Sequence, residues 1–198
     1  MIVGLTGGIG SGKSVVAGML AKAGAVIVDT DALAREVVEP PSPTLEKIRA
    51  EFGPAAIALD GRLDRDAVAK IVFSDEQKRR RLNELTHPEI LKRALAEIGR
   101  YPSSTIVVVV VPLLFESGFE RNCDRIIAVL APEAMRLARV VQRDGSDSAD
   151  VRARMRAQLP DGAYAAAGAI LIHNTGSVED LRAGVDAAWR ELTAAQSR

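Results

Sequence analysis

Hydrophobic residues gather in five short runs along the chain, at residues 2–5, 25–29, 105–111, 125–130 and 169–173. Within each run most positions are apolar, so apolar and polar residues do not alternate. Continuous apolar runs are typical of strands that are buried on both faces, as in a parallel sheet. Segments with helical periodicity separate the runs, which predicts βαβ units. We therefore expect an α/β fold, a three-layer sandwich around a five-stranded parallel sheet.

The spacing of these runs is uneven. About 75 residues separate the second run from the third, too many for one crossover helix. Three pairs of residues in this stretch are typical of helix starts: Ser42 with Pro43, Ser74 with Gln77, and Thr86 with Glu89. We expect a mostly helical insertion over residues 35–100. A second helical insertion, rich in arginine, is expected over residues 132–161, with a turn at residues 145–148.

Composition narrows the possible partners. The 26 basic and 26 acidic residues give a formal net charge of zero, and 47% of the residues are hydrophobic, enough for a sizeable core. The balance of charge argues against a nucleic-acid partner held by a broad basic surface. The single cysteine, Cys123, cannot form an internal disulfide. It fits a reducing compartment, and we expect it to be a small buried side chain.

No targeting or membrane segment is expected. Glycines interrupt the apolar start of the chain from position 7 onward, and no basic segment precedes it, unlike a signal peptide. The longest apolar run, residues 106–115, is far shorter than the roughly 20 residues that cross a bilayer. We therefore expect a cytoplasmic protein without a membrane partner.

The most informative motif runs from Gly7 to Ser14 and reads G-G-I-G-S-G-K-S, which fits G-x-x-x-x-G-K-[ST]. It lies between a predicted strand and a predicted helix, which argues against a simple glycine turn with an exposed lysine. Glycines let the backbone fold around a phosphate, and the helix N-terminus adds partial positive charge. Lys13 would reach the β- and γ-phosphates, and the Ser14 hydroxyl would ligate Mg²⁺. The motif predicts a P-loop NTPase fold.

Two carboxylates, Asp29 and Asp31, follow the second predicted strand. Ligands in open parallel sheets bind beyond the carboxyl ends of the strands, so we expect at least one of the two to be functional. A kinase needs a carboxylate that orients and deprotonates the acceptor hydroxyl. Asp31 could instead cap a helix that begins at Ala32, or bind Mg²⁺ through water. The sequence leaves these roles open.

The third predicted strand is followed by Pro112, where many motor ATPases and GTPases place an aspartate that supports Mg²⁺. The next residues, Leu113, Leu114 and Phe115, are apolar and precede Glu116. They could form a buried loop under the core or an apolar wall against a bound ligand. The sequence favours neither of the two.

Arginines in the second insertion suit a lid that closes over a nucleotide. Phosphoryl transfer spreads negative charge over the γ-phosphoryl oxygens, which a lid arginine can stabilise. Arg139 and Arg143 are four residues apart on one helical face and form the best candidate pair. The whole set comprises Arg136, Arg139, Arg143, Arg152, Arg154 and Arg156.

Four other features have simpler interpretations. Residues 78–81, the run K-R-R-R, are typical of a solvated helix surface. His87 precedes Pro88 and is more typical of a helix start than of a catalyst. Trp189 shares a helical face with Val185 and Leu192 and is expected in the core. Ser177 with Asp180 predicts the start of the last helix.

Taken together, the motifs resemble the dephospho-CoA kinase family. That family has T-G-G-I-G-S-G-K-S/T, D-x-D-x-x-A-R and a T/I-H-P element, found here at residues 6–14, 29–35 and 86–88. Its P-L-L-F-E element stands at 112–116, R-x-x-x-R-D at 139–144, R-x-x-x-Q at 154–158 and N-x-G at 174–176. The phosphate loop alone is generic, but the combination in this order is specific.

The resemblance implies ATP- and Mg²⁺-dependent phosphorylation of the ribose 3′-hydroxyl of dephospho-CoA, the last step of coenzyme A synthesis. It implies a nucleotide-binding core of residues 1–34, 101–131 and 162–198, a helical CoA-binding insertion at 35–100, and a lid at 132–161. We expect a monomer or a weak homo-oligomer. The expected partner is dephospho-CoA, and no nucleic acid is expected.

The resemblance also assigns roles to single residues. The expected catalytic residues are Asp31 as the base, Lys13, Arg139 and Arg143. The expected nucleotide-binding residues are Gly8, Ile9, Gly10, Ser11, Gly12, Lys13, Ser14, Val15 and Asn174, with Asn174 beside the adenine and Ser14 on the metal. The expected acceptor-binding residues are Asp31, Arg35, His87, Pro112, Leu113, Leu114 and Phe115.

The chain departs from the family pattern before the last strand. Residues 161–168 lack the lysine and the aspartate that the family often has there, and His173 stands where an aspartate is frequent. These differences affect two expected features, a basic contact made by the lid and the details of the adenine pocket. They do not affect the reaction class. A kinase of another small acceptor is the main alternative. A GTP-dependent switch would carry the guanine-reading sequence N-K-x-D, which this chain lacks.

Overall fold

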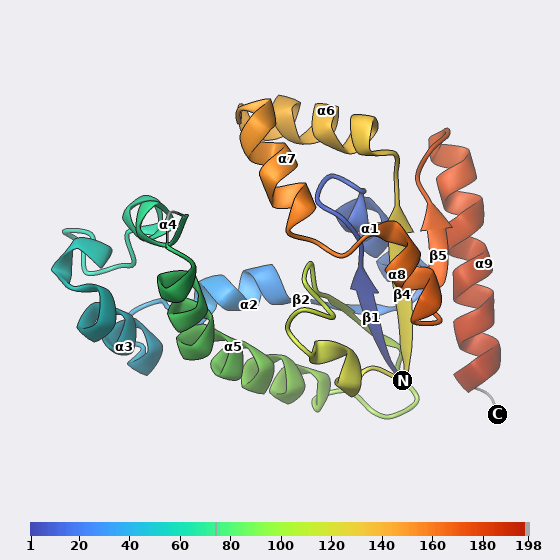
Figure 1. Ribbon diagram of the computed structural model, residues 1–198. Coiled ribbons are helices and arrows are strands. Elements are labelled where there is room, and N and C mark those ends of the chain that lie inside the picture. The colour runs from blue at the N-terminus through green and yellow to red at the C-terminus, as the bar shows by residue number, and fades with distance from the viewer. Residues whose placement is uncertain (74, 197–198) are drawn as a thin grey trace. The chain divides into compact units, whose positions relative to one another are not determined.

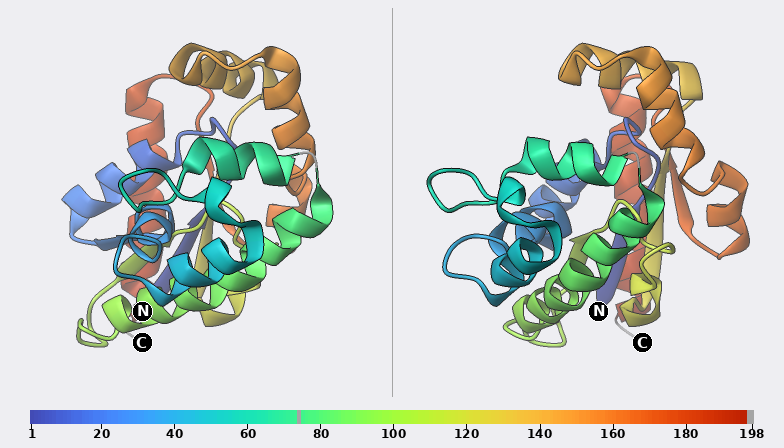
Figure 2. Two further views of the ribbon diagram at one scale, coloured as in Figure 1. Left: turned by 90° about the vertical axis from the view of Figure 1, so that its left-hand side faces the viewer. Right: turned by 60° about the vertical axis from the view of Figure 1, so that its left-hand side comes forward.

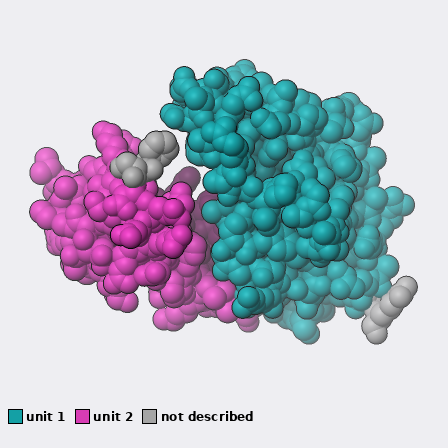
Figure 3. Space-filling model, viewed as in Figure 1, with its two compact units in different colours: residues 1–28, 100–198 teal, residues 29–99 magenta. Residues whose placement is uncertain are grey.

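The computed structural model describes residues 1–73 and 75–196 of the chain. It contains two compact units, shown in different colours in Figure 3. Unit 1 comprises residues 1–28 and 100–198, and unit 2 comprises residues 29–99. Each unit has a hydrophobic core of its own and is described separately. The expected helix start at Ser74 lies outside the described residues.

Unit 1 is built on a parallel sheet. The strands are β1 (Ile2–Thr6), β2 (Val26–Asp29), β3 (Val107–Val110), β4 (Arg125–Leu130) and β5 (Ile170–His173), in the order β2-β3-β1-β4-β5. β1 pairs in parallel with β3 and β4, and β4 pairs in parallel with β5. All five predicted strands are confirmed, and β2 ends at the first residue of unit 2.

Both faces of the central strand β1 are buried, which explains its continuous apolar sequence. Val3 and Leu5 face one core cluster. Gly4 faces the other side, where a Cβ would lie 2.9 Å from Cys123 Sγ and 3.1 Å from the Leu114 side chain. Cys123 is partly buried, and desolvation raises the pKa of its thiol to about 12.

Two helices, α1 (Lys13–Ala23) and α9 (Val178–Gln196), cover the first face of the sheet. α9 runs beside β5 in both Figures 1 and 2. Trp189 on α9 packs against this core, as predicted. The predicted start of α9 is also confirmed, because Asp180 N donates to Ser177 Oγ at 3.1 Å and Ser177 N donates to Asp180 Oδ2 at 2.9 Å.

The arginine-rich insertion forms two helices, α6 (Glu133–Asp144) and α7 (Ser148–Arg156), which we call the lid helices. Gly145 ends α6 with a φ of 62°, in the turn that the sequence predicts there. A short helix, α8 (Asp161–Ala166), leads into β5, and a 3-10 turn at Phe119–Asn122 leads towards β4.

Unit 2 is helical, as the sequence predicts. Its elements are α2 (Thr30–Glu36), α3 (Pro43–Phe52), a 3-10 turn (Pro54–Ala56), α4 (Arg65–Phe73) and α5 (Glu76–Ile98). Val37, Ile48 and Val68 lie at the centre of its core. The N-cap at Ser42 is confirmed, because its Oγ accepts hydrogen bonds from Thr44 N and Leu45 N at 3.1 and 3.3 Å.

The predicted helix start at Thr86 is wrong, because α5 runs through this position without a break. The Thr86 hydroxyl donates to the Leu82 carbonyl at 2.9 Å and therefore caps nothing. Leu82, Leu85 and Ile90 all pack against the core of unit 2, so burial of this face favours one long helix despite Pro88. His87 accordingly lies within α5 and does not mark a helix start.

The basic run at residues 78–81 is exposed on α5, as predicted. Its side chains pair with nearby carboxylates. Arg80 lies 2.7 Å from Glu76, and Arg81 lies 3.0 Å from Glu51 and 2.9 Å from Glu84. Such solvated pairs contribute little to stability.

The reciprocal bonds between Ser177 and Asp180 give a test of the fold. We expect Ser177→Ala to lower the free energy of unfolding by about 1 kcal/mol, because the N-terminal turn of α9 loses its cap. Urea denaturation followed by circular dichroism measures the change. Ser104→Ala, an exposed serine in a turn, is the matched control and should change the free energy by less than about 0.5 kcal/mol. Equal stability of the two variants would contradict the assignment.

Candidate active site

The glycine-rich loop between β1 and α1 has the conformation that a phosphate-binding loop needs. Gly7 and Gly12 have φ angles of 136° and 102°, in the region that favours glycine. A Cβ at Gly7 would clash with the Val129 carbonyl oxygen of β4, and a Cβ at Gly12 would clash with Asn174 Nδ2. The predicted order of strand, loop and helix is confirmed.

Lys13 lies at the start of α1, and its side chain folds back over the loop. Its Nζ donates to the Gly7 carbonyl at 2.8 Å and to the Gly8 carbonyl at 3.1 Å. Ser14 follows in the first turn and is exposed. α1 has no acidic residue in its first turn, so the partial positive charge of its N-terminus is not offset there.

Two hydroxyl groups at the loop are buried. Thr6 Oγ1 and Ser11 Oγ have no hydrogen-bond partner within the described part of the chain. Ser11 Oγ lies close to Gly7, 3.1 Å from the position that a Cβ would take there. Together with the glycine backbone, these donors form a polar cradle whose chemistry fits a phosphate group.

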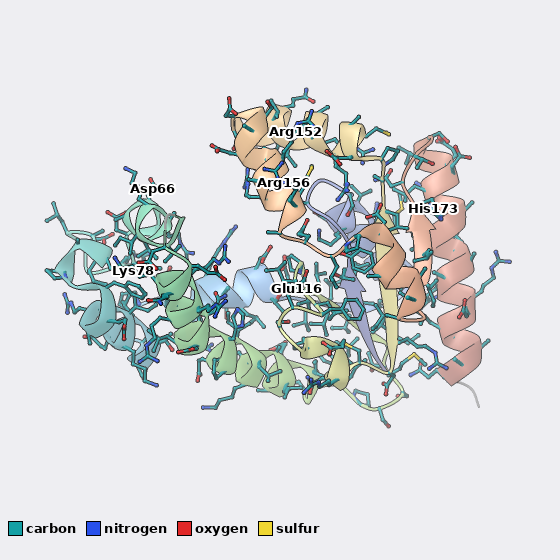
Figure 4. All side chains as sticks on the ribbon, in the orientation of Figure 1. Asp66, Lys78, Glu116, Arg152, Arg156 and His173 are labelled. Atoms are coloured by element: carbon teal, nitrogen blue, oxygen red, sulfur yellow. The ribbon has the colours of Figure 1, made fainter. Side chains whose placement is uncertain are left out.

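Asn174, directly after β5, supports the loop through a hydrogen bond to its backbone. Its Nδ2 donates to the Ser11 carbonyl at 2.8 Å, and its backbone N donates to the Leu130 carbonyl at 2.8 Å. The side chain is 9% exposed. The structure thus places Asn174 against the phosphate loop, while the expected contact with adenine stays a prediction. His173, labelled in Figure 4, is exposed.

The two arginines that the sequence favours in the lid are placed differently. Arg139 Nη1 donates to the Gly10 carbonyl at 3.4 Å, so this side chain reaches the loop. Arg143 forms two hydrogen bonds with Asp144, at 2.6 and 3.0 Å, and its side chain is 63% exposed. This pairing lowers the pKa of Asp144 and raises that of Arg143.

Arg136 is the lid arginine whose position the sequence did not single out. Its guanidinium packs against Gly8, where a Cβ would clash with Arg136 Nη1. The Nε atom is buried without a hydrogen-bond partner, and no ion pair of Arg136 occurs among the residues that the structure describes. The sequence feature that could have identified Arg136 is its position one helical turn before Arg139. By contrast, Arg152 on α7 pairs with Glu133 at 3.1 Å (Figure 4).

The loop after β3 is exposed at one leucine and buried at the next, and its role as an apolar wall against a ligand stays a prediction. Leu114 is fully buried under the sheet, whereas Leu113 is 42% exposed. Phe115 packs against Tyr164 with ring centroids 6.0 Å apart. Glu116, labelled in Figure 4, accepts a hydrogen bond from Leu159 N at 3.3 Å, which joins this loop to the segment after α7. Burial raises the pKa of Tyr164 to about 12, with Glu116 and Asp161 adding to the shift.

Unit 2 carries the other candidate residues. Asp29, not Asp31, caps α2, because its Oδ1 accepts a hydrogen bond from Asp31 N at 2.9 Å. The alternative that Asp31 caps a helix beginning at Ala32 is therefore wrong. Asp31 and Arg35 are exposed, one turn apart on α2. Desolvation lowers the pKa of His87 on α5, which favours its neutral form.

Two features are absent from the described residues. No three or more histidine, cysteine, aspartate or glutamate side chains cluster in a way that could hold a metal ion. Among residues 1–73 and 75–196, no helix has the length and apolar character needed to cross a membrane.

Comparison with known proteins places the chain in a family. The family model for dephospho-CoA kinase matches residues 1–180. A curated dephospho-CoA kinase of Moorella thermoacetica is 46% identical over 194 residues, covering 96% of this chain and 92% of that protein.

Solved structures agree with the sequence comparisons. A crystal structure from Thermus thermophilus has a TM-score of 0.84 and 39% identity, covering 98% of each chain. A dephospho-CoA kinase from Campylobacter jejuni has a TM-score of 0.72 and 26% identity, also covering 98% of each chain. The chain belongs to the dephospho-CoA kinase family.

Proposed function

We propose that this protein transfers the γ-phosphoryl group of ATP to the ribose 3′-hydroxyl of dephospho-CoA, giving coenzyme A and ADP. The observation that carries the proposal is the phosphate loop, whose glycine backbone, Lys13 and α1 N-terminus form a site for a nucleotide phosphate. Membership of the dephospho-CoA kinase family over residues 1–180 supports the choice of acceptor.

The phosphate loop would hold the triphosphate. Backbone N–H groups of the loop and the Lys13 ammonium donate to phosphate oxygens, and the buried Ser11 hydroxyl is a further donor. Ser14, exposed beside Lys13, is the residue that would ligate Mg²⁺, and the ATP oxygens and water would supply the remaining ligands. When bound, the ion would neutralise charge on the β- and γ-phosphates.

The lid arginines would stabilise negative charge during transfer. Arg139 already reaches the Gly10 carbonyl, and Arg136 lies against Gly8 without a carboxylate partner among the described residues. Arg136 is partly buried and has no described carboxylate beside it, so an anion at the loop would be attracted to its guanidinium. The Arg143 side chain would have to leave Asp144 before it could contact a phosphate. Its role in stabilising the transferred phosphoryl group therefore stays a prediction.

Asp31 is our candidate for the catalytic base. Asp29 uses a carboxylate oxygen to cap α2, and Asp31 is exposed in the first turn of that helix, at the position of the D-x-D-x-x-A-R motif to which the family resemblance assigns the base. In the proposed step the Asp31 carboxylate takes the proton of the acceptor hydroxyl as that oxygen bonds to the γ-phosphorus. The bond from the γ-phosphorus to the bridging oxygen breaks, and ADP leaves with that electron pair.

The remaining candidate residues would bind the acceptor. Arg35 and His87 lie in unit 2, the helical unit that we propose binds dephospho-CoA. Leu113, exposed in the loop after β3, would contribute apolar contact, together with Pro112 and Phe115. Leu114 is fully buried and would act only by shaping this loop. A cytoplasmic location and a monomeric or weakly associated state stay predictions.

ADP release tests the function and the base together. With ATP and Mg²⁺, we expect release that depends on dephospho-CoA and is weak with adenosine or a nucleotide. Asp31→Asn should lower kcat by about a hundredfold or more, because it removes the proton acceptor, and should leave ATP binding intact. Asp66→Asn is the matched control, since Asp66 is also exposed in the first turn of a helix of unit 2 (Figure 4).

Two outcomes would count against these assignments. Release that depends on adenosine or a nucleotide, but not on dephospho-CoA, would reject the acceptor. A kcat of Asp31→Asn close to that of Asp66→Asn would reject Asp31 as the base while leaving the reaction in place.

The charge on Arg136 gives a second test. We expect Arg136→Gln to lower kcat/KM for ATP by about tenfold or more, because a hydrogen bond to a charged phosphate is lost. Steady-state kinetics at saturating dephospho-CoA measures the loss. Arg152→Gln changes an exposed lid arginine that pairs with Glu133 and should stay near the wild-type value. Equal effects of the two substitutions would contradict a special role for Arg136.

A further inference from the structure

The tip of the phosphate loop, residues 8–10, is in contact with the lid helices. The Ile9 side chain packs against a cluster formed by the lid residues Val140, Val151 and Met155. Gly10 is close to α6, because a Cβ at Gly10 would lie 2.6 Å from the Arg136 carbonyl oxygen. The tip is therefore in contact with both lid helices.

One hydrogen bond links the backbone of this tip to the end of the lid. Ile9 N donates to Gln158 Oε1 at 2.7 Å, across 149 positions of sequence. Gln158 lies just after α7, and its own backbone N donates to the Met155 carbonyl at 3.2 Å. The next residue, Leu159, donates to Glu116. The backbone hydrogen bonds of Gln158 and Leu159 thus anchor the segment that carries the Gln158 side chain.

The peptide group between Gly8 and Ile9 is hydrogen-bonded both to Gln158 and to Lys13. A trans peptide is planar, with its N–H and its C=O pointing in opposite directions. The N–H of this peptide meets Gln158, while its carbonyl accepts hydrogen bonds from Lys13 Nζ and from Ser11 N, each at 3.1 Å. Rotation of the peptide would break all three bonds together.

We propose that Gln158 is a positioning residue for Lys13. By fixing the Gly8–Ile9 peptide, Gln158 aims the Gly8 carbonyl at the Lys13 ammonium and so sets the ammonium within the loop. The lid therefore influences the phosphate-binding lysine through the loop backbone, because the Gly8 carbonyl that accepts from Lys13 belongs to the peptide group that Gln158 holds. This inference rests on the proposed function, because it assumes that the loop binds ATP.

Three substitutions separate the hydrogen bond from the bulk of the side chain. Gln158→Met keeps the length and removes the acceptor, and Gln158→Asn keeps the amide but is one methylene too short. Gln158→Glu retains an acceptor for Ile9 N. Gln142→Met is the control, because Gln142 is an exposed glutamine on α6, away from the loop hydrogen bonds.

Amide exchange of Ile9, followed by nuclear magnetic resonance, reports on the bond without any acceptor substrate. We expect faster exchange of the Ile9 amide in Gln158→Met and Gln158→Asn, and protection in Gln158→Glu and Gln142→Met. ATP affinity, measured calorimetrically, should fall about two- to tenfold in the Met and Asn variants, as the loss of one neutral hydrogen bond predicts. KM for dephospho-CoA should not change.

Wild-type Ile9 exchange in both Gln158→Met and Gln158→Asn would overturn the proposal, and so would faster exchange with unchanged ATP affinity. A parallel rise in KM for both substrates would also overturn it, because it would indicate a general structural role. If the protein phosphorylates a different acceptor, the exchange and ATP measurements keep their meaning, so failure of the proposed reaction is distinguishable.

Discussion

The backbone conformation of the phosphate loop is the constraint on which the other features of unit 1 depend. The loop follows β1, and β4 and β5 are the next strands in the sheet. This order brings the Val129 carbonyl against Gly7 and the Asn174 amide against Gly12. A side chain at either glycine would clash with these atoms, so the packing of β4 and β5 against the loop requires glycine at both positions.

The lid helices also hold the phosphate loop, through contacts with residues 9 and 10 at its tip. Arg139 and Gln158 bind backbone groups of Gly10 and Ile9, while the Ile9 side chain packs into the lid core. Apolar packing and hydrogen bonds thus hold the loop tip, and Arg136 adds a positive charge beside it. For a reaction that requires positioning and charge stabilisation, such a preorganised loop is the main contribution the protein can make.

Much of the fold could be predicted because strong signals were local. Continuous apolar runs predicted the strands, and the pair Ser177 and Asp180 predicted the start of α9. The start at Thr86 failed because a local capping pattern competed with burial of one long face of α5. The sequence favoured Arg143 over Arg136, whereas Arg136 is the one that lies against Gly8, because the contact depends on how α6 approaches the loop in space. The bond between Gln158 and Ile9 joins distant segments, and no local pattern predicts it.

The defining step of the proposed function is the transfer of a phosphoryl group from ATP to one hydroxyl of dephospho-CoA. The most direct measurement incubates the purified protein with ATP, Mg²⁺ and dephospho-CoA and locates the new phosphate by mass spectrometry and phosphorus nuclear magnetic resonance. We expect one added phosphoryl group on the ribose 3′-oxygen, formed in equal amount to ADP. ADP formed without modified dephospho-CoA, or a phosphate at another position, would contradict the proposed function.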